Sequence, residues 1–202
     1  MTASIGRRDF FRFGGTKITE LTSHLAAAKT ANRAERWIRP PFARDELEFL
    51  LSCTRCDACI AACPHDVLFA LSPKEGRTAA GTPAMDLLRQ GCHMCTDWPC
   101  VTACEPDALK LPEDEEDLPP ASPKFASARI AQTNCLPYSG PECGACADSC
   151  PVPGALSWEG GARPVIDPEH CTGCALCREA CIVDPNAIQI FALVPGERTA
   201  TA

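Results

Sequence analysis

The sequence predicts an α+β fold that is rich in loops and built from one short unit repeated four times. The sixteen cysteines fall in four runs of four, and a short apolar segment follows each run. The 202 residues also include 19 prolines and 13 glycines, which leave little room for long helices or strands. We therefore expect something other than a large apolar core to hold the fold together.

The four apolar segments are the expected strands of this unit. In most copies a proline stands close behind the cysteines and the apolar residues come next. A fixed recurrence at this scale is typical of a repeat architecture built from one supersecondary unit. The predicted strands are residues 67–71, 108–111, 155–158 and 187–191.

The first 45 residues differ from the rest of the chain. Residues 1–45 contain no cysteine. Near their end, at Arg39, Pro40 and Pro41, two consecutive prolines disfavour a helix and mark a boundary. We interpret them as a basic N-terminal arm, with a predicted exposed helix from Thr19 to Arg36.

The body of the chain is predicted to span residues 46–195, followed by a C-terminal tail at 196–202. Two linkers inside the body have weak structural signals. Residues 72–83 are rich in small side chains, and residues 113–117 are all acidic. Both are predicted to be loops, the second one solvated.

Charge and hydropathy limit the kinds of partner. Residues 1–45 carry nine basic and four acidic side chains, whereas residues 46–202 carry ten and twenty-two, within a net charge of −7. Such an acidic body is not expected to bind nucleic acid. No stretch approaches the roughly 18 consecutive apolar residues that a membrane span needs, so no transmembrane segment is predicted.

The first cysteine run carries the most specific signal. It consists of Cys53, Cys56, Cys59 and Cys63 followed by Pro64, which is the C-x2-C-x2-C-x3-C-P spacing of bacterial iron–sulfur proteins. Three thiolates at this spacing converge on three corners of a cubane, and the fourth ligates the other cluster of a pair.

The other three runs are variants of the same pattern. The second is expanded in its second gap, the third is expanded in its first gap, and the fourth is compact again but has no proline directly after it. The four motifs cover residues 53–63, 92–104, 135–150 and 171–181. Beyond the first run, the candidate ligands are Cys92, Cys95, Cys100, Cys104, Cys135, Cys143, Cys146, Cys150, Cys171, Cys174, Cys177 and Cys181.

These motifs predict four [4Fe–4S] clusters, held by bacterial-ferredoxin-like units in two bicluster modules. Two alternatives fit the sequence less well. Cysteine at this density also suits a secreted disulfide scaffold, but the sequence shows no cleavable signal peptide and the spacings are those of metal ligands. Zinc also binds four cysteines, but structural zinc sites usually split them into two pairs separated by a longer loop.

The pairing of the runs is a separate expectation. Because runs one and four are compact while two and three are expanded, we expect one to pair with four and two with three. One cluster would then be held by Cys53, Cys56, Cys59 and Cys181, and its twin by Cys171, Cys174, Cys177 and Cys63. Sequential pairing, one with two and three with four, is the alternative.

Other side chains near the cysteines have supporting roles in this interpretation. His65, His93 and His170 lie beside candidate ligands, but no cysteine is missing, so they are not expected to bind iron. Trp98 and Trp158 are expected to shield clusters from water. Outside the cysteines we find no nucleotide-binding glycine loop and no nucleophile with its base, so an electron carrier is predicted rather than an enzyme.

Several stretches resemble a known family of ferredoxin-type accessory proteins, with similarity from about Arg36 to Leu193. The segment that leads into the first cluster motif of NapF proteins is similar to RWIRPPFARDELEFLLSCTRCDACIAACP. Two other segments are more similar to NapG and MauM proteins: AGTPAMDLLRQGCHMCTDWPCVTACEPDAL and CTGCALCREACIVDPNAI. The expanded third motif of both groups resembles CLPYSGPECGACADSCPV.

The resemblance implies an iron–sulfur electron-transfer function. A NapF-like protein would relay electrons to, or assist maturation of, a molybdenum-dependent periplasmic nitrate reductase, with a NapA-like catalytic subunit as its partner. A NapG-like or MauM-like protein would instead be the electron-transfer subunit of a membrane quinol dehydrogenase.

The same resemblance bears on location. GRRDFFR resembles a twin-arginine export motif, but Lys17, Glu20, His24 and Lys29 fall where an apolar segment of about 7–15 residues should follow. We therefore expect a cytoplasmic protein, with twin-arginine export to the periplasm as the alternative.

Overall fold

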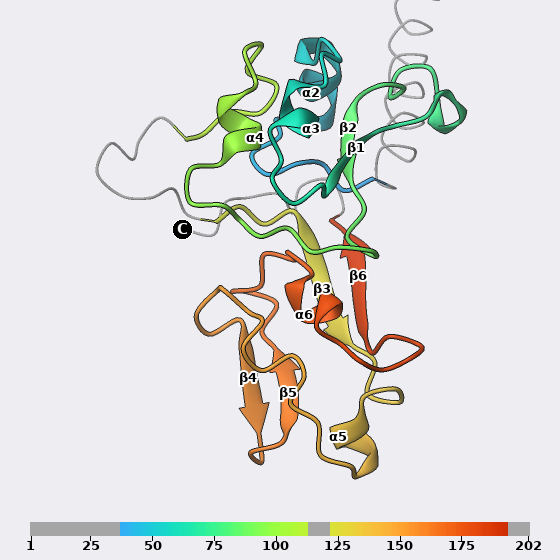
Figure 1. Ribbon diagram of the computed structural model, residues 1–202, viewed down its shortest axis with the longest axis vertical. Coiled ribbons are helices and arrows are strands. Elements are labelled where there is room, and N and C mark those ends of the chain that lie inside the picture. The colour runs from blue at the N-terminus through green and yellow to red at the C-terminus, as the bar shows by residue number, and fades with distance from the viewer. Residues whose placement is uncertain (1–36, 113–121, 194–202) are drawn as a thin grey trace, which may run out of the picture. The chain divides into compact units, whose positions relative to one another are not determined.

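A computed structural model of the chain describes residues 37–112 and 122–193 (Figure 1). Its elements are short and mix helix with strand, as the sequence predicts. In chain order they are α2 (Glu46–Ser52), α3 (Ala58–Ala61), β1 (Leu68–Ala70), the 3-10 helix η1 (Pro73–Glu75), β2 (Pro83–Met85), α4 (Pro99–Thr102), β3 (Ala126–Ile130), α5 (Leu136–Ser139), β4 (Leu156–Glu159), β5 (Arg163–Ile166), α6 (Leu176–Glu179) and β6 (Ile188–Ala192).

The strands form three antiparallel pairs: β1 with β2, β3 with β6, and β4 with β5. Three of the four predicted strands are confirmed, since β1, β4 and β6 lie in the expected apolar runs. The fourth run, 108–111, makes only an isolated bridge from Leu109 to Ala43. Two backbone hydrogen bonds flank that bridge, from Arg44 to Ala108 and from Lys110 to Phe42, so the pairing is confined to a very short stretch.

The body begins at Trp37, not at residue 46. Contacts divide the chain into residues 1–36 and 37–202. The Arg39 side chain and its neighbours Pro40 and Pro41 are among the most deeply buried residues of the molecule. The two prolines thus belong to the core of the body, although the sequence suggested that they mark the end of the arm.

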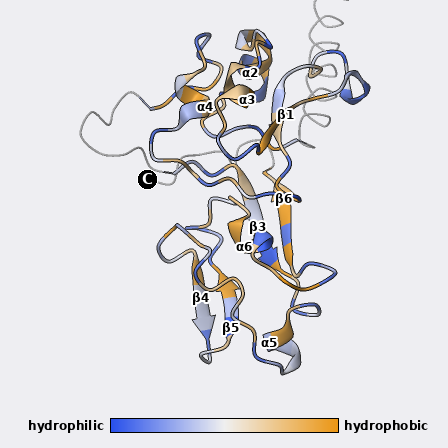
Figure 2. Cartoon of the chain, in the orientation of Figure 1, coloured by the Kyte–Doolittle hydropathy of each residue, from blue (hydrophilic) through white to orange (hydrophobic). Residues whose placement is uncertain are grey.

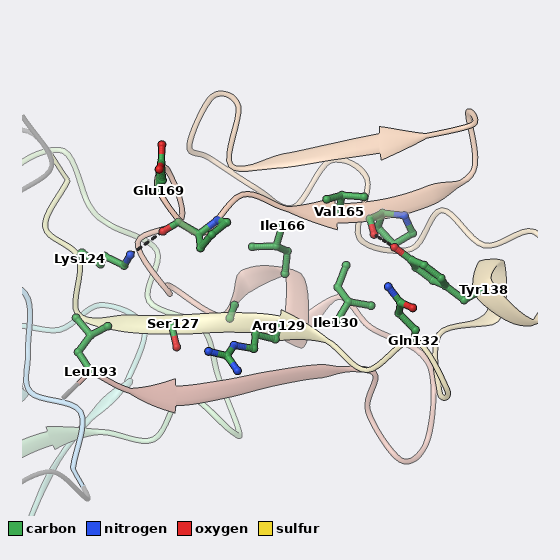
Figure 3. Close-up of a pocket in the computed structure, with 13 residues that line it drawn as sticks. Lys124, Ser127, Arg129, Ile130, Gln132, Tyr138, Val165, Ile166, Glu169 and Leu193 are labelled. Atoms are coloured by element: carbon green, nitrogen blue, oxygen red, sulfur yellow. Dashed lines mark hydrogen bonds between the residues drawn. The ribbon is translucent and has the colours of Figure 1, made fainter. Parts of the chain in front are cut away.

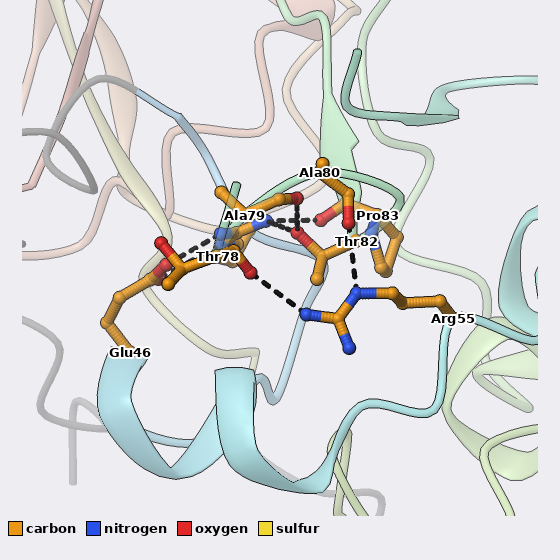
Figure 4. Close-up of polar contacts among 8 residues, drawn as sticks. Glu46, Arg55, Thr78, Ala79, Ala80, Thr82 and Pro83 are labelled. Carbon is orange, nitrogen blue, oxygen red and sulfur yellow. Dashed lines mark hydrogen bonds and ion pairs between the residues drawn. The ribbon is translucent and has the colours of Figure 1, made fainter. Parts of the chain in front are cut away.

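A buried ion pair fixes this entry segment. The guanidinium of Arg39 donates from Nε to Glu46 Oε2 at 3.0 Å and from Nη2 to Glu46 Oε1 at 2.6 Å. Its Nη1 donates to Thr82 Oγ1 and to the Pro83 carbonyl, both at 2.9 Å. Figure 4 shows Glu46, Thr82 and Pro83 converging from α2 and the start of β2.

The loop between β1 and β2 is held by a second arginine. Arg55, which lies between two candidate ligands, donates from Nε to the Ala80 carbonyl and from Nη2 to the Thr78 carbonyl, both at 2.9 Å (Figure 4). The predicted loop at 72–83 therefore has an ordered course, with η1 at its start and the first residue of β2 at its end.

Two groups of buried apolar residues form the core. The larger gathers Phe49 of α2, Val101 of α4, Leu87 and Leu109, while the smaller surrounds Ile188 of β6. Along β6 exposed residues alternate with buried or half-buried ones, and Figure 2 shows a mostly apolar strand interrupted by a polar band. Cysteines belong to both groups, so the apolar core is built around the thiols.

Three predictions fall outside the described residues. They are the helix from Thr19 to Arg36, the acidic run at 113–117 and the tail at 196–202.

Candidate metal centres

Four thiols from two runs line one small cavity. Cys63 comes from the end of the first run, and Cys92, Cys95 and Cys100 are the first three cysteines of the second. The buried side chain of Trp98 also lines this cavity.

The neighbouring thiolates that raise the pKa of the other thiols point to three further sets of the same composition. Each set combines the first three cysteines of one run with the last cysteine of an adjacent run. The sets are Cys53, Cys56 and Cys59 with Cys104; Cys135, Cys143 and Cys146 with Cys181; and Cys171, Cys174 and Cys177 with Cys150.

These sets correct the expected pairing. In the structure the last cysteine of run one lies with run two and that of run four lies with run three, which contradicts the expected pairing of run one with run four. The physical reason is local: α3, which carries Cys59, packs against α4, which carries Cys100. Similarity of spacing said nothing about which helices pack together.

A recurring backbone geometry positions the thiols. The residue two before the third cysteine is left-handed in three runs: Asp57 (φ 59°), Trp98 (φ 44°) and Ala175 (φ 67°). In each case it is the N-cap of the short helix that carries the third cysteine. Left-handed residues reverse the backbone so that successive N–H groups point into one concavity, which suits an anionic cluster.

The residue before the second cysteine is also left-handed in these three runs, at Arg55, Met94 and Gly173. In the third run, helix α5 occupies the longer first gap instead. Sequence reasoning missed these positive φ angles, because only Gly173 and, to a smaller extent, Asp57 belong to residue types that favour such a conformation.

Backbone donors reach several of the sulfurs. The Leu109 N–H donates to Cys104 Sγ at 3.4 Å. A hydrogen bond from the Ala58 backbone is the main reason why the pKa of the exposed thiol of Cys56 is lowered. Donors aimed at sulfur stabilise a thiolate and would tune the reduction potential of a bound cluster.

Burial has the opposite effect on most of the other thiols. It raises the pKa of Cys92, Cys100 and Cys177 to about 12 and that of Cys59 and Cys174 to about 11, and repulsion between neighbouring thiolates acts in the same direction. Without metal, these five thiols would stay protonated at neutral pH. Bound iron would supply the positive charge that the thiolates lack, so the donor set fits a cationic iron–sulfur core.

Among the described residues, no group of three or more His, Cys, Asp or Glu side chains is close enough to hold a single metal ion. A zinc ion draws its thiolates to about 2.3 Å from one point. A four-iron cluster takes one thiolate at each of four corners and needs a wider set.

The histidines and tryptophans lie beside the thiols. The rings of His65 and His93 stack with centroids 3.6 Å apart and line the same cavity as Cys63. His170 instead pairs with Asp167, with 2.7 Å between Nδ1 and Oδ2. Trp158 packs against the smaller core group, which contains Cys146 and Cys177.

A larger groove of the described residues lies elsewhere. It has a volume of about 770 Å³ and lies between β3 and β5. Figure 3 shows Arg129 and Ile130 of β3 on one side and Val165 and Ile166 of β5 on the other. None of its lining residues is a cysteine, so it is separate from the candidate centres.

Comparison with known proteins identifies relatives over most of the chain. The methylamine utilization ferredoxin-type protein MauM of Paracoccus denitrificans is 34% identical over 84% of this chain and 78% of its own. The ferredoxin-type protein NapG of Escherichia coli is 31% identical over 93% of this chain and 86% of its own. The ferredoxin-type protein NapF of Escherichia coli is 34% identical over 75% of this chain and 84% of its own.

No family model and no solved structure matches the chain. Within residues 37–112 and 122–193, no helix has the length and apolar content needed to cross a membrane. The identities and the coverage show that the chain belongs to the ferredoxin-type family of MauM, NapG and NapF proteins and is an iron–sulfur electron-transfer protein.

Proposed function

We propose that the sixteen cysteines hold four [4Fe–4S] clusters in two bicluster modules and that the chain relays single electrons to a protein partner. The observation that carries this proposal is the composition of the four thiol sets, each with three cysteines from one run and the last cysteine of its neighbour. That exchange is the ligation rule of two-cluster ferredoxins.

When bound, a [4Fe–4S] cluster supplies one-electron oxidation and reduction. The residues of this chain bind it, orient it and limit its access to water. Backbone N–H groups point at sulfurs, and Trp98 closes one wall of the cavity that Cys63 and Cys92 line. Hydrogen bonding and burial are the two properties by which the protein would set each potential.

Iron and acid-labile sulfide analysis of anaerobically purified protein tests the cofactor. We expect about sixteen irons and sixteen sulfides per chain, with broad visible absorbance. Protein that stays colourless after reconstitution, or that yields zinc instead, would overturn the proposal.

For the partner, we propose a NapF-like role: relaying electrons to, or assisting maturation of, a molybdenum-dependent nitrate reductase with a NapA-like catalytic subunit. Co-purification with that subunit tests it. If the chain binds no molybdoenzyme and its deletion leaves nitrate reductase activity unchanged, the role is wrong.

A second candidate is the electron-transfer subunit of a membrane quinol dehydrogenase, as in the NapG-like or MauM-like interpretation. One observation favours it: the match to NapG covers 93% of this chain, whereas the match to NapF covers 75%. Membrane association that depends on an integral partner would support this candidate over the first.

For location, we propose the cytoplasm, with twin-arginine export as the alternative. Fusing residues 1–45 to a folded reporter distinguishes the two. A reporter that stays in the cytoplasm supports the proposal, and delivery of a folded reporter to the periplasm contradicts it.

A further inference from the structure

Two segments that carry candidate ligands of different modules are in direct contact. The Cys92 N–H donates to the Cys174 carbonyl at 2.7 Å. Cys92 belongs to the set completed by Cys63, and Cys174 belongs to the set completed by Cys150. One hydrogen bond therefore joins the backbones of two ligands of different clusters.

A glycine permits this approach. A Cβ added to Gly91 would lie 2.8 Å from the backbone nitrogen and Cδ2 of Leu176 and 2.9 Å from its Cα. The obstruction includes backbone, which cannot rotate away as the end of a flexible side chain can. Any larger residue at position 91 would force the two segments apart.

Further contacts hold the segments in register. The Gly91 N–H donates to Glu179 Oε2 at 2.8 Å, and Arg178 Nε donates to the Leu88 carbonyl at 3.2 Å. The buried Thr172 hydroxyl approaches Met94 Sδ at 3.4 Å. We call residues 88–94 and 172–179 together the junction.

Apolar packing also crosses the junction. Cys174 and Ala175 belong to the same buried group as Leu87, Trp98 and Cys100 of the first half. The junction is therefore part of a packed core, which fixes distances more firmly than contacts between exposed loops would.

We propose that the junction is the route by which electrons cross between the two bicluster modules, with Gly91 as the residue that sets their separation. The inference rests on the proposed function. With clusters bound on both sides, one electron would pass from the reduced cluster to the oxidised one, and no bond or proton would change place. Electron tunnelling weakens steeply with distance, so the hydrogen-bonded ligand pair is the favourable crossing.

This route gives the four centres a linear order. Exchange of the last cysteine links the sets of runs one and two, the junction links the sets of runs two and four, and exchange of the last cysteine links the sets of runs four and three. Cys56, an exposed ligand, lies in the set at one end. We place an exchange point with an external partner at that end.

Magnetic coupling between reduced clusters tests the junction. The full chain carrying Cys56→Ala and Cys143→Ala should load only the two central sets, with about eight irons after anaerobic reconstitution. After dithionite reduction, we expect its electron paramagnetic resonance spectrum to show splitting from the two neighbouring unpaired electrons. Adding Gly91→Ala should remove or narrow that splitting.

Gly144→Ala is the control for the glycine-to-alanine change itself, because nothing lies within 4 Å of its added Cβ and the residue lies outside the two central sets. It should leave the splitting unchanged. Eight irons without splitting in the parent, or splitting that Gly91→Ala leaves intact, would overturn the junction alone. An iron content far from eight would overturn the ligand sets and, with them, the junction.

A second variant covers the case in which Gly91→Ala prevents loading. Glu179 is exposed, so Glu179→Ala removes the acceptor of the Gly91 N–H without emptying a core site. We expect it to weaken the splitting while retaining about eight irons. Glu142→Ala, at another exposed glutamate, should not change the spectrum; equal spectra from both variants would contradict the junction.

Discussion

At the scale of single residues, the Arg39 guanidinium is the clearest case of a buried charge whose donors are matched to acceptors. It is almost fully buried, lies 4.7 Å from the Phe49 ring centroid and bonds bidentately to Glu46. Burial removes water from the charge, so stability depends on every remaining acceptor being in place.

Glu46→Gln tests this dependence. Removing the carboxylate charge leaves the arginine buried and only partly compensated, and we expect unfolding to become easier by about 3 kcal/mol. The measurement is the urea midpoint of the loaded protein under anaerobic conditions. Glu48→Gln is the control, because Glu48 is exposed and 3.8 Å from Arg44, and its loss should stay below about 1 kcal/mol. Equal losses would contradict the buried pair.

A left-handed residue offers a second test at this scale. Asp57 is exposed, has φ 59° and makes no side-chain cap hydrogen bond. Asp57→Gly should raise stability by about 0.5–1 kcal/mol, because glycine adopts this conformation without strain, whereas Asp57→Val should lower it by about 1–2 kcal/mol. Thermal midpoints of the loaded variants measure both.

Ala58→Gly provides the comparison for Asp57→Gly, since Ala58 is helical and glycine should destabilise it by about 0.5–1 kcal/mol. Stabilisation at position 58, or destabilisation at 57 by glycine, would show that the left-handed geometry is not what matters there.

At the scale of elements, the sequence predicts three of the six strands of the described residues and few of the turns. Alternating apolar segments after the cysteines identify β1, β4 and β6 because burial follows directly from residue type. The run at 108–111 is equally apolar, but it can pair only with a very short stretch of backbone around Ala43 and so forms no strand. The left-handed turns at Arg55 and Trp98 give no sequence signal because the surrounding metal site, not the residue type, would impose them.

The thiol-bearing elements also predict how metal loading responds to pH. Burial raises the pKa of Cys100 and Cys177 to about 12 and that of Cys59 to about 11. A thiol whose pKa is higher in the folded chain than in the unfolded chain stabilises the metal-free fold. The thiols of an unfolded chain lose their protons near pH 8.5, so this contribution to stability is complete below about pH 8.5 and is lost as the pH rises toward 11–12. Cluster binding favours the deprotonated thiol instead, since iron binds the thiolate.

We therefore expect loading to release about one proton for each buried thiol at neutral pH and to strengthen from about pH 6 to about pH 9. Proton release during anaerobic reconstitution in weak buffer, together with chelator competition at several pH values, measures both effects. A chain with all its thiols alkylated beforehand is the blank. Loading that is independent of pH would contradict the protonated state of the metal-free sites.

At the scale of the whole molecule, the sequence identifies the sixteen thiols but not their partners. Spacing within a run is a local property, and it predicts candidate ligands one run at a time. Which run supplies the fourth thiol depends on the packing of α3 against α4 and on the contacts of β3 with β6, which are long-range. The body likewise begins at Trp37 because Arg39 finds its partners 43 and 44 residues further along the chain.

Paired cysteine substitutions convert this arrangement into a count of irons. Cys63→Ala and Cys92→Ala affect one thiol set, so the double variant should lose about four irons, no more than either single variant. Cys63→Ala with Cys171→Ala affects two sets and should lose about eight. Iron, sulfide and visible absorbance per chain are measured after identical anaerobic reconstitution. If Cys63 shared its cluster with Cys171, the two results would be exchanged, because substitutions on one cluster do not add while those on separate clusters do.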